Sequence, residues 1–269
     1  MSSIDPTARI ASGAVIGAGV EIGPYTIVGP NVVIGDGCVI KAHVNVDGHT
    51  TVGERTAIYP FASIGTPPQS VHYKGGPTKL VIGKGCQIRE NVTINIGTEG
   101  GGGITTIGDN CFMMAGSHVA HDCHVGNNVV FANNAVIAGH VEVGDYVFLG
   151  GHVAVAQRTR IGESVMVGGY TAMRDDAVPF GYVLYPNGRL VGLNIVGMRR
   201  RGFSRDAIKA VRAAYAILFA EDGEYKVRLE QVATEFAAVP EVMTMVTFLR
   251  AAKRMVMTTR KRGSQADDE

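Results

Sequence analysis

A large apolar residue recurs at every sixth position through the first two thirds of the chain. The series starts at Ile4, Ile10 and Ile16 and runs, with two interruptions, to Met173. A second register lies four residues after each large residue and holds small or β-branched side chains, beginning with Ala8. A helix repeats about every 3.6 residues and a flat strand about every 2, so neither explains this spacing. The period of six predicts a coiled chain with three flat faces, in which each hexad supplies one short strand and one turn.

Three hexads complete one coil of 18 residues, so each residue should lie directly beneath the residue 18 positions later. At a strand spacing of ~4.8 Å, such coils would build a column whose narrow interior is filled by the large residues. Glycine or asparagine is expected at the corners, where the backbone needs a positive φ. All four cysteines fall in the small inward register, so we predict free, buried thiols at Cys38, Cys86, Cys111 and Cys123.

The repeat is interrupted twice, and each interruption predicts a loop outside the column. The stretch between Ile64 and Ile82 keeps the phase but lacks the apolar residues, so residues 65–81 should form the first loop. The next stretch is one residue longer than two hexads, so residues 95–106 should form the second. Binding groups concentrate in loops that leave a regular solenoid.

The hexads stop near residue 180, and a helical pattern follows. Ser204 suits the N-cap of a helix that Gly223 would end. A second helix is expected over 224–238, and Pro240 should open a third whose apolar face extends to Val256.

The predicted fold class is therefore mainly β, with a β-helix over residues 1–190 and an α-helical domain over 191–269. The last ten residues, 260–269, have the composition of a frayed end.

Composition excludes several classes of protein. Hydrophobic residues make up 46% of the chain, which is enough to fill a core and argues against disorder. The 25 basic and 24 acidic residues leave a net charge of +1, which argues against a general nucleic-acid or membrane-surface binder. The sequence shows no transmembrane run and no secretory signal, so we predict a cytosolic protein.

Unusual polar residues cluster in the segment 114–124, which contains His118, His121, Asp122 and His124. The stacking rule places His140 one coil above Asp122. It places Gly139 one coil above His121 and Gln157 two coils above it. An imidazole beside a carboxylate is a plausible general base, and the bare N–H of a glycine could face a developing oxyanion.

Other interpretations of these residues stay open on the sequence alone. Surface histidines are often solvated and without a role, and the three histidines of this segment, His118, His121 and His124, could instead hold zinc. The run 100–103 (GGGG) lacks the ending of a phosphate-binding P-loop and is better explained as a flexible loop. The basic run Arg199-Arg200-Arg201 is either a solvated face or a site for an anion or a partner.

Four segments carry a resemblance to known proteins. They are 118–123 (HVAHDC), 133–140 (NNAVIAGH), 166–169 (MVGG) and 194–204 (NIVGMRRRGFS). Together with the repeat, they resemble the hexapeptide-repeat acyltransferases, and within these the family of UDP-N-acetylglucosamine O-acyltransferases, which start lipid A synthesis. The resemblance implies a left-handed parallel β-helix of hexapeptide repeats with a C-terminal α-helical domain. The left hand comes from the resemblance alone, because ordinary parallel crossovers are right-handed.

The resemblance also implies the reaction. A 3-hydroxyacyl group would pass from acyl carrier protein to the sugar 3-position of a UDP-sugar. His121 matches the family's general base, Asp122 would orient it, and the N–H of Gly139 would stabilise the oxyanion. No metal or organic cofactor is implied beyond the phosphopantetheine thioester arm of the carrier protein.

Further residues match or neighbour family positions that contact the nucleotide sugar or the acyl donor. These predicted substrate-binding residues are Gln69, Ser70, His72, His118, His140, Gln157, Gly169, Asn194, Arg200 and Arg201. Gly169 matches the position that measures acyl length, and a glycine there implies a long chain. Family members are homotrimers with sites between subunits. Basic residues of the helical domain, including Arg199 and Arg205, would face the acidic carrier protein.

Four positions depart from many relatives, namely Ser70, His72, Ala156 and Val196, where Asp, Lys, His and Glu are common. The acceptor could accordingly be the 3-amino analogue of the UDP-sugar, because an amine needs different hydrogen-bond partners from a hydroxyl. Two other functions compete with acyl transfer: a trimeric zinc enzyme of the γ-carbonic-anhydrase kind, and a non-catalytic scaffold.

Overall fold

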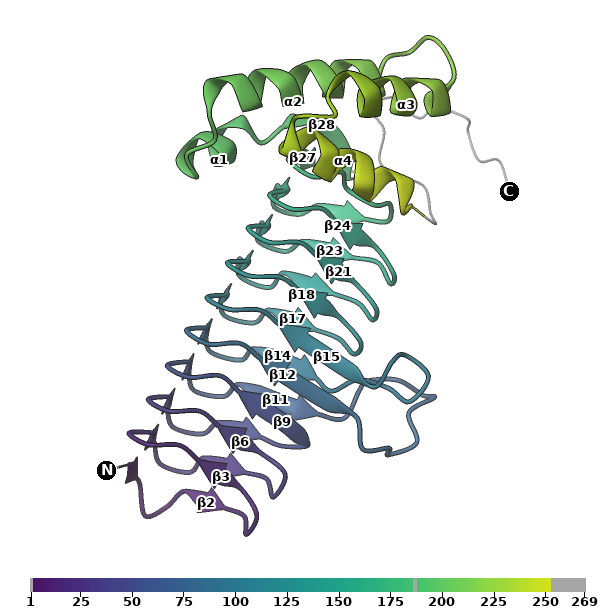
Figure 1. The fold of residues 1–269 in the computed structure, drawn as a ribbon. Coiled ribbons are helices and arrows are strands. Elements are labelled where there is room, and N and C mark those ends of the chain that lie inside the picture. The colour runs from purple at the N-terminus through teal and green to yellow at the C-terminus, as the bar shows by residue number, and fades with distance from the viewer. Residues whose placement is uncertain (1, 186–187, 253–269) are drawn as a thin grey trace.

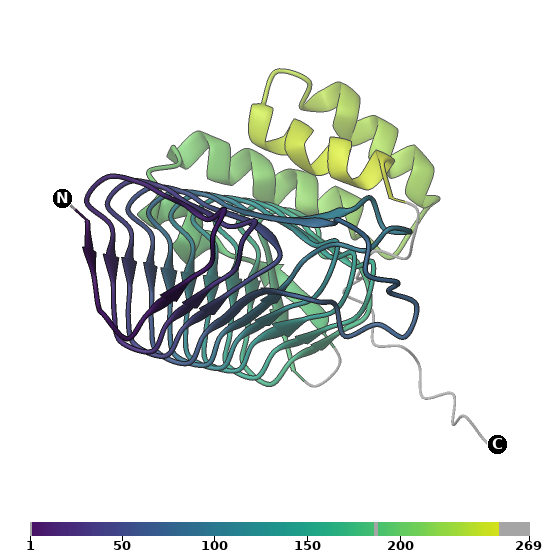
Figure 2. The same ribbon diagram turned by 90° about the horizontal axis from the view of Figure 1, so that it is seen from below.

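The computed structural model describes residues 2–185 and 188–252. Short strands wind into a tall column, and helices cover the end that holds the later coils (Figure 1). Seen from below, the successive coils lie in register one behind another (Figure 2). In these residues, no helix is both long and apolar enough to cross a membrane.

The column has three faces, and each face is a sheet of parallel strands, which in the first sheet is extended by one antiparallel strand, β28. The first sheet contains β1 (Ser3–Ile4), β4 (Glu21–Ile22), β7 (Val39–Ile40), β10 (Ala57–Ile58), β13 (Gln87–Ile88), β16 (Phe112–Met113), β19 (Val130–Phe131), β22 (Phe148–Leu149), β25 (Met166–Val167), β27 (Gly181–Leu184) and β28 (Arg189–Leu193). The second contains β2 (Arg9–Ile10), β5 (Ile27–Val28), β8 (Asn45–Val46), β11 (Ser63–Thr66), β14 (Thr93–Asn95), β17 (His118–Val119), β20 (Val136–Ile137), β23 (Ala154–Val155) and β26 (Ala172–Met173). The third contains β3 (Val15–Ile16), β6 (Val33–Ile34), β9 (His49–Val52), β12 (Lys79–Ile82), β15 (Ile104–Ile107), β18 (His124–Val125), β21 (Glu142–Val143) and β24 (Arg160–Ile161).

The strand register confirms the predicted stacking. Ile4 pairs with Ile22 and Val119 with Ile137, each 18 positions later. The large residue of each hexad points inward, and Ile40, for example, is fully buried. Burying such a side chain contributes roughly 1.5–3 kcal/mol, so the repeated interior residue is the main source of stability. The four cysteines are free and buried, as predicted.

Both predicted loops leave the column, on the same side (Figures 1 and 2). The first loop covers 67–78 and the second 96–103, because the flanking strands extend further than predicted on both sides. The coils on either side still pair: Cys86 donates to Thr56 across 30 positions, and Thr93 faces His118 across 25. The loops are therefore insertions that leave the column continuous.

Glycine and asparagine occupy only some of the corners with positive φ, so that expectation was incomplete. Tyr25 and His43 have φ of 57°, and Asp122 and His140 have φ of 58° and 61°. Side chains at equivalent corners contact one another from coil to coil. The rings of Tyr25 and His43, for instance, stack with centroids 5.1 Å apart. Such contacts offset the backbone strain of a non-glycine residue.

The helical segment begins after an antiparallel hairpin of β27 and β28, and β27 extends the first sheet. Its helices are α1 (Ile195–Arg200), α2 (Arg205–Leu218), α3 (Tyr225–Glu235) and α4 (Pro240–Arg250). The Ser204 hydroxyl accepts from the N–H of Ala207, which confirms the predicted N-cap of α2. Pro240 opens α4 as predicted, whereas Val256 and residues 260–269 lie outside the described residues.

The structure differs from the sequence analysis in two details of this segment. The sequence analysis did not predict α1, which is short and is capped by the side chain of Asn194. Helix α2 ends at Leu218, before Gly223, because Arg228 donates to the carbonyls of Leu218, Asp222 and Gly223 and so satisfies the backbone beyond the helix.

Candidate active site

The clustered polar residues come from the turn between β17 and β18 and from the coil above it. His118 lies on β17 and points outward from the second sheet, and His121 and Asp122 follow in the turn. His140 occupies the equivalent corner one coil later, where its N–H donates to the carbonyl of His121. His124 lies on the third sheet instead, with its Nδ1 2.9 Å from the Thr106 hydroxyl, so the turn separates it from the other histidines.

His121 and Asp122 form a hydrogen-bonded dyad. Nδ1 of His121 lies 2.8 Å from Oδ2 of Asp122, whose side chain is fully buried. Burial alone would raise the pKa of the Asp122 carboxyl, but hydrogen bonds from Thr98 and His121 outweigh it and hold that pKa below its usual range. The carboxylate therefore stays ionised and fixes the ring so that Nε2, the opposite nitrogen, is available for proton transfer.

Gly139 lies against the imidazole of His121, as the stacking rule predicts. A side-chain carbon at position 139 would come within 2.5 Å of Cε1 and 2.8 Å of Nε2 of that ring. Only a residue without a side chain fits there. The N–H groups of its neighbours Ala138 and His140 donate to carbonyls of adjacent coils, so the peptide is held in place on both sides.

Two further histidines flank the dyad. The rings of His121 and His140 meet edge to face at 5.1 Å, and Nε2 of His140 lies 3.9 Å from the Asp122 carboxylate. Nδ1 of His118 is 2.7 Å from the hydroxyl of Thr93. Burial lowers the pKa of both His118 and His140, so both are neutral near pH 7 and can act as hydrogen-bond partners without added charge.

A hollow of about 480 Å³ opens in front of these residues. His118, His121 and Gly139 line it together with Gln69 from the first loop and Gln157 two coils above His121. Asn95 and Arg174 add polar groups to the wall, and the other lining residues are apolar ones of the second sheet and its turns, so the hollow combines polar groups with an apolar surface. That combination suits a polar substrate group and an attached hydrocarbon chain.

His121, Asp122 and His140 are also the residues that could hold a metal ion, since one donor atom from each lies within 4.8 Å of the others. Neither His118 nor His124 belongs to that group, so within the described residues the three histidines of segment 114–124 do not form the cluster. In the structure, Oδ2 of Asp122 already accepts from the Thr98 hydroxyl at 2.6 Å as well as facing His121. The carboxylate thus has donors in place for a role as an anion that orients the imidazole.

The remaining predicted residues lie away from this hollow. Ser70 and His72 are in the first loop, where the N–H of His72 donates to the Ser70 hydroxyl at 3.3 Å. Gly169 lies at a corner beside Gly151. The side chain of Asn194 caps α1: its Oδ1 accepts from the N–H of Gly197, and its Nδ2 donates to the carbonyl of Ser164. None of these four lines the hollow within the described part of the chain.

Arg200 and Arg201, at the end of α1, lie outside the hollow too. Arg200 is exposed. The guanidinium of Arg201 packs over the rings of Tyr146 and Phe203, and within the described residues its Nε and Nη2 are buried without a hydrogen-bond partner.

The sequence analysis missed Arg174, which lines the hollow directly after β26, and two residues from the interrupted part of the repeat. Thr98 in the second loop donates from both its N–H and its hydroxyl to Asp122. Asn95 lines the hollow, and its amide donates to Thr66 and Pro67 at the root of the first loop. Both residues belong to the interrupted part of the repeat, where the 18-residue rule does not apply, so no periodic signal marked them.

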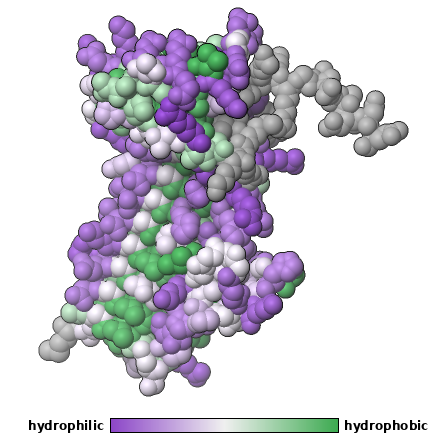
Figure 3. Space-filling view, turned by 45° about the vertical axis from the view of Figure 1, so that its right-hand side comes forward, coloured by the Kyte–Doolittle hydropathy of each residue, from purple (hydrophilic) through white to green (hydrophobic). Residues whose placement is uncertain are grey.

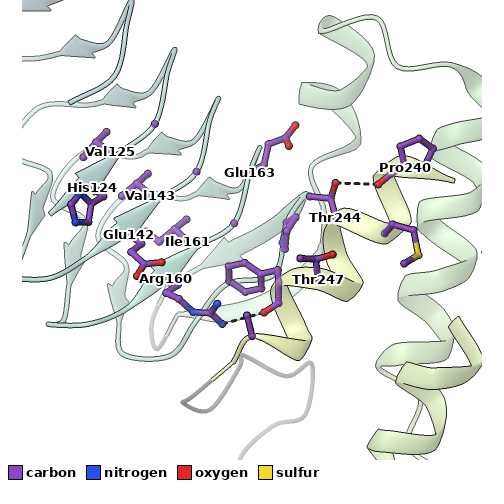
Figure 4. A pocket seen from close by; sticks show the side chains of 17 residues that line it. His124, Val125, Glu142, Val143, Arg160, Ile161, Glu163, Pro240, Thr244 and Thr247 are labelled. Atoms are coloured by element: carbon purple, nitrogen blue, oxygen red, sulfur yellow. Dashed lines mark hydrogen bonds between the residues drawn. The ribbon is translucent and has the colours of Figure 1, made fainter. Parts of the chain in front are cut away.

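A larger hollow, about 1040 Å³, lies between α4 and the third sheet (Figure 4). Arg160 crosses one end of it, donates to the carbonyl of Phe248 and packs over that residue's ring (Figure 4). On the outside of the column, a band of hydrophobic surface reaches the helical segment between polar flanks (Figure 3). Among the described residues that line this larger hollow, no acid and base are hydrogen-bonded to each other as His121 and Asp122 are, so its size does not make it the better candidate for catalysis.

Comparisons with known proteins agree with this arrangement. Residues 176–257 match the family model described as UDP N-acetylglucosamine O-acyltransferase, domain 2. Residues 13–48 and 104–139 match the bacterial transferase hexapeptide model of six repeats. With the three parallel sheets, these matches confirm the predicted left-handed β-helix followed by helices.

Two curated relatives carry the same name, acyl-[acyl-carrier-protein]–UDP-N-acetylglucosamine O-acyltransferase. The protein from Azorhizobium caulinodans is 54% identical over 266 residues, which is 99% of this chain and 98% of the relative. That from Caulobacter vibrioides is 53% identical over 201 residues, 75% of this chain and 76% of the relative. A solved structure of LpxA from Acinetobacter baumannii superposes with a TM-score of 0.92 at 37% identity, covering 94% of this chain and 99% of that one.

Proposed function

The chain belongs to the acyl-[acyl-carrier-protein]–UDP-N-acetylglucosamine O-acyltransferase family, and we propose from this premise how its residues carry out the reaction. The enzyme transfers an acyl group from acyl carrier protein to UDP-N-acetylglucosamine in lipid A synthesis. The acyl group we propose is a 3-hydroxyacyl chain, delivered to the 3-position of the sugar. The observation that carries the mechanism is the His121–Asp122 dyad with Gly139 stacked against it.

In this mechanism, Nε2 of His121 removes the proton from the sugar 3-hydroxyl as that oxygen attacks the thioester carbonyl. Asp122 stabilises the imidazolium that forms, because its buried carboxylate remains charged. The N–H of Gly139 donates to the oxyanion of the tetrahedral intermediate. When the carbon–sulfur bond breaks, the imidazolium returns its proton to the leaving thiolate, so His121 ends neutral.

Gln69, His118, His140 and Gln157 are proposed to hold the UDP-sugar and the acyl chain. Support comes from their position: three of them line the hollow, and His140 adjoins it through its contact with His121. The neutral state of the two histidines lets them donate or accept hydrogen bonds to sugar hydroxyls.

A homotrimer would complete the site. On four neighbouring strands of the first sheet the outward residues are apolar and partly exposed, and they form a row that a neighbouring subunit would cover: Phe112, Val130, Phe148 and Met166. The predicted substrate residues that this chain does not bring to its own hollow would then serve the neighbour's: Ser70, His72, Gly169, Asn194, Arg200 and Arg201. Nε and Nη2 of Arg201, which find no hydrogen-bond partner among the described residues, suit an anionic group of the nucleotide.

Acyl carrier protein is the proposed second partner. Arg199, Arg200 and Arg205 are exposed on the helical segment and would attract an acidic surface. We expect no metal or organic cofactor beyond the carrier's thioester arm. Metal analysis of the purified protein tests this expectation, because one zinc per chain would favour the zinc enzyme instead. A cytosolic location stays a prediction for cell fractionation to check.

The deciding experiment is His121→Ala. Loss of a general base usually costs ~10²–10⁴-fold in rate, so product formation from acyl carrier protein and UDP-N-acetylglucosamine, followed by mass spectrometry, should fall by that factor. Circular dichroism and the melting temperature should stay those of the wild type, because the side chain lies outside the column's interior. Full activity in this variant would remove His121 from the mechanism.

A further inference from the structure

The two loops that leave the column are bonded to each other. The hydroxyl of Thr78, at the end of the first loop, donates to the carbonyl of Gly97 in the second at 2.6 Å. The N–H of Gly76 donates to the carboxylate of Glu99 at 2.6 Å. The first loop carries Gln69, which lines the hollow. The second loop is therefore held in a fixed relation to a loop that would contact substrate.

The second loop also donates two hydrogen bonds to the carboxylate of Asp122. The N–H of Thr98 donates to Oδ1 at 2.9 Å, and its hydroxyl donates to Oδ2 at 2.6 Å. Oδ2 is the oxygen that faces Nδ1 of His121. Because one residue holds both carboxylate oxygens, it fixes the plane of the carboxylate and, through it, the orientation of the imidazole.

The glycines of the second loop fit this contact closely. A methyl group on Gly101 would overlap the Asp122 carboxylate, whereas a methyl group on Gly100 would meet open space. The run of glycines thus has a packing reason at position 101, in addition to any flexibility. The loop can approach the carboxylate only because that position has no side chain.

We propose that Thr98 is a positioning residue for the His121–Asp122 dyad, and that the second loop ties the dyad's placement to the first loop. The proposal rests on the acyl transfer proposed above. Thr98 touches neither substrate nor the reacting atoms and acts only through Asp122. The second loop thereby keeps His121 and the first loop, which carries Gln69, in a fixed position relative to each other.

The test compares Thr98→Val, which removes the hydroxyl and keeps the volume, with Thr98→Ser, which keeps the hydroxyl. Misplacing a catalytic group by 1 Å can cost about 100-fold, so kcat of Thr98→Val should fall about 10- to 100-fold, with KM for both substrates nearly unchanged. Thr98→Ser should recover most of the rate. Thr51→Val, on the exposed face of β9, is the matched control and should behave as the wild type.

Three more variants sharpen the result. Gly101→Ala should lower kcat as Thr98→Val does, and Gly100→Ala should not, although both add one methyl to the same loop. Glu99→Ala, which removes the bond to Gly76 and so loosens the first loop, should raise KM for the UDP-sugar more than it lowers kcat. If Thr98→Val fails to fold, the serine variant and the two glycine variants decide the question.

An active wild type combined with a wild-type kcat in Thr98→Val overturns the positioning role and leaves the acyl transfer intact. Equal rates for Gly101→Ala and Gly100→Ala, or a serine variant as slow as the valine variant, overturn it as well. A wild-type enzyme that forms no acylated sugar refutes the proposed function itself, and the two failures are thereby distinguished.

Discussion

Gly139→Ala tests the stacked geometry of the site most directly. The added carbon would lie 2.5 Å from Cε1 and 3.1 Å from Nδ1 of His121. Carbon atoms in contact sit about 3.5–4.0 Å apart, so the imidazole must move by about an ångström. It cannot do so and keep its 2.8 Å contact with Asp122, whose carboxylate is buried and held by Thr98.

A displacement of about 1 Å can cost 10²-fold in rate, which corresponds to about 2.7 kcal/mol in the activation barrier. Steady-state kinetics with acyl carrier protein and UDP-N-acetylglucosamine should show kcat about 100-fold lower, with KM changed far less. Gly151→Ala is the control, because its nearest non-neighbouring atom would be 3.5 Å away, an ordinary contact. Both variants should melt at the wild-type temperature.

A double variant separates this explanation from a general disturbance of the turn. If the methyl acts by displacing the imidazole, adding Gly139→Ala to His121→Ala should slow the reaction little further. If the double variant instead loses the product of the two single-variant factors in rate, the methyl acts on a part of the site other than the imidazole. Activity of Gly139→Ala within about threefold of the wild type would refute the stacking argument, since a base displaced by 1 Å cannot keep its rate.

Three other predictions follow from the described contacts. Arg160 pairs with the buried Asp176 at 2.8 Å and binds the Phe248 carbonyl, so Arg160→Met should lower the free energy of unfolding in urea by about 3–5 kcal/mol; a loss below about 1 kcal/mol would contradict this. Burial lowers the pKa of His118 below 6.5, so its folded form binds fewer protons than the unfolded chain and stability falls as pH drops below that value. His118→Gln should flatten that fall by at most about 1.4 kcal/mol per pH unit, measured at fixed protein concentration. If Ser70 and Ala156 adapt the site to an amine, the 3-amino UDP-sugar should be acylated at least as fast in direct competition, and a clear preference for the hydroxyl sugar rejects the idea.

The column and the core of the site were predictable because both follow from one period. Once a coil is known to take 18 residues, the neighbours of His121 and Asp122 in the next coil are fixed as Gly139 and His140. The apolar side chains inside the column fix the pairing register of the strands, because a shift by one residue would turn the interior row outward.

The rest was not predictable, because it depends on contacts between segments outside the repeat. Thr98 and Asp122 are 24 positions apart, which is not a multiple of a coil, and they meet only because the second loop folds back onto the turn. The role of Asn194 as a cap of α1 depends on a helix too short to show a periodic pattern. The sequence motif around it marked a family position without indicating its local structure.

The corner that carries Asp122 and His140 also has a consequence for how the enzyme could be stabilised. Both residues hold the left-handed backbone conformation that glycine adopts without strain, and Arg158 does so one coil later with φ of 63°. For a residue with a side chain that conformation costs roughly 1–2 kcal/mol. Glycine at Arg158 would relieve that strain without touching the dyad, whereas Asp122 must keep its carboxylate for Thr98 and His121, and His140 its ring against His121.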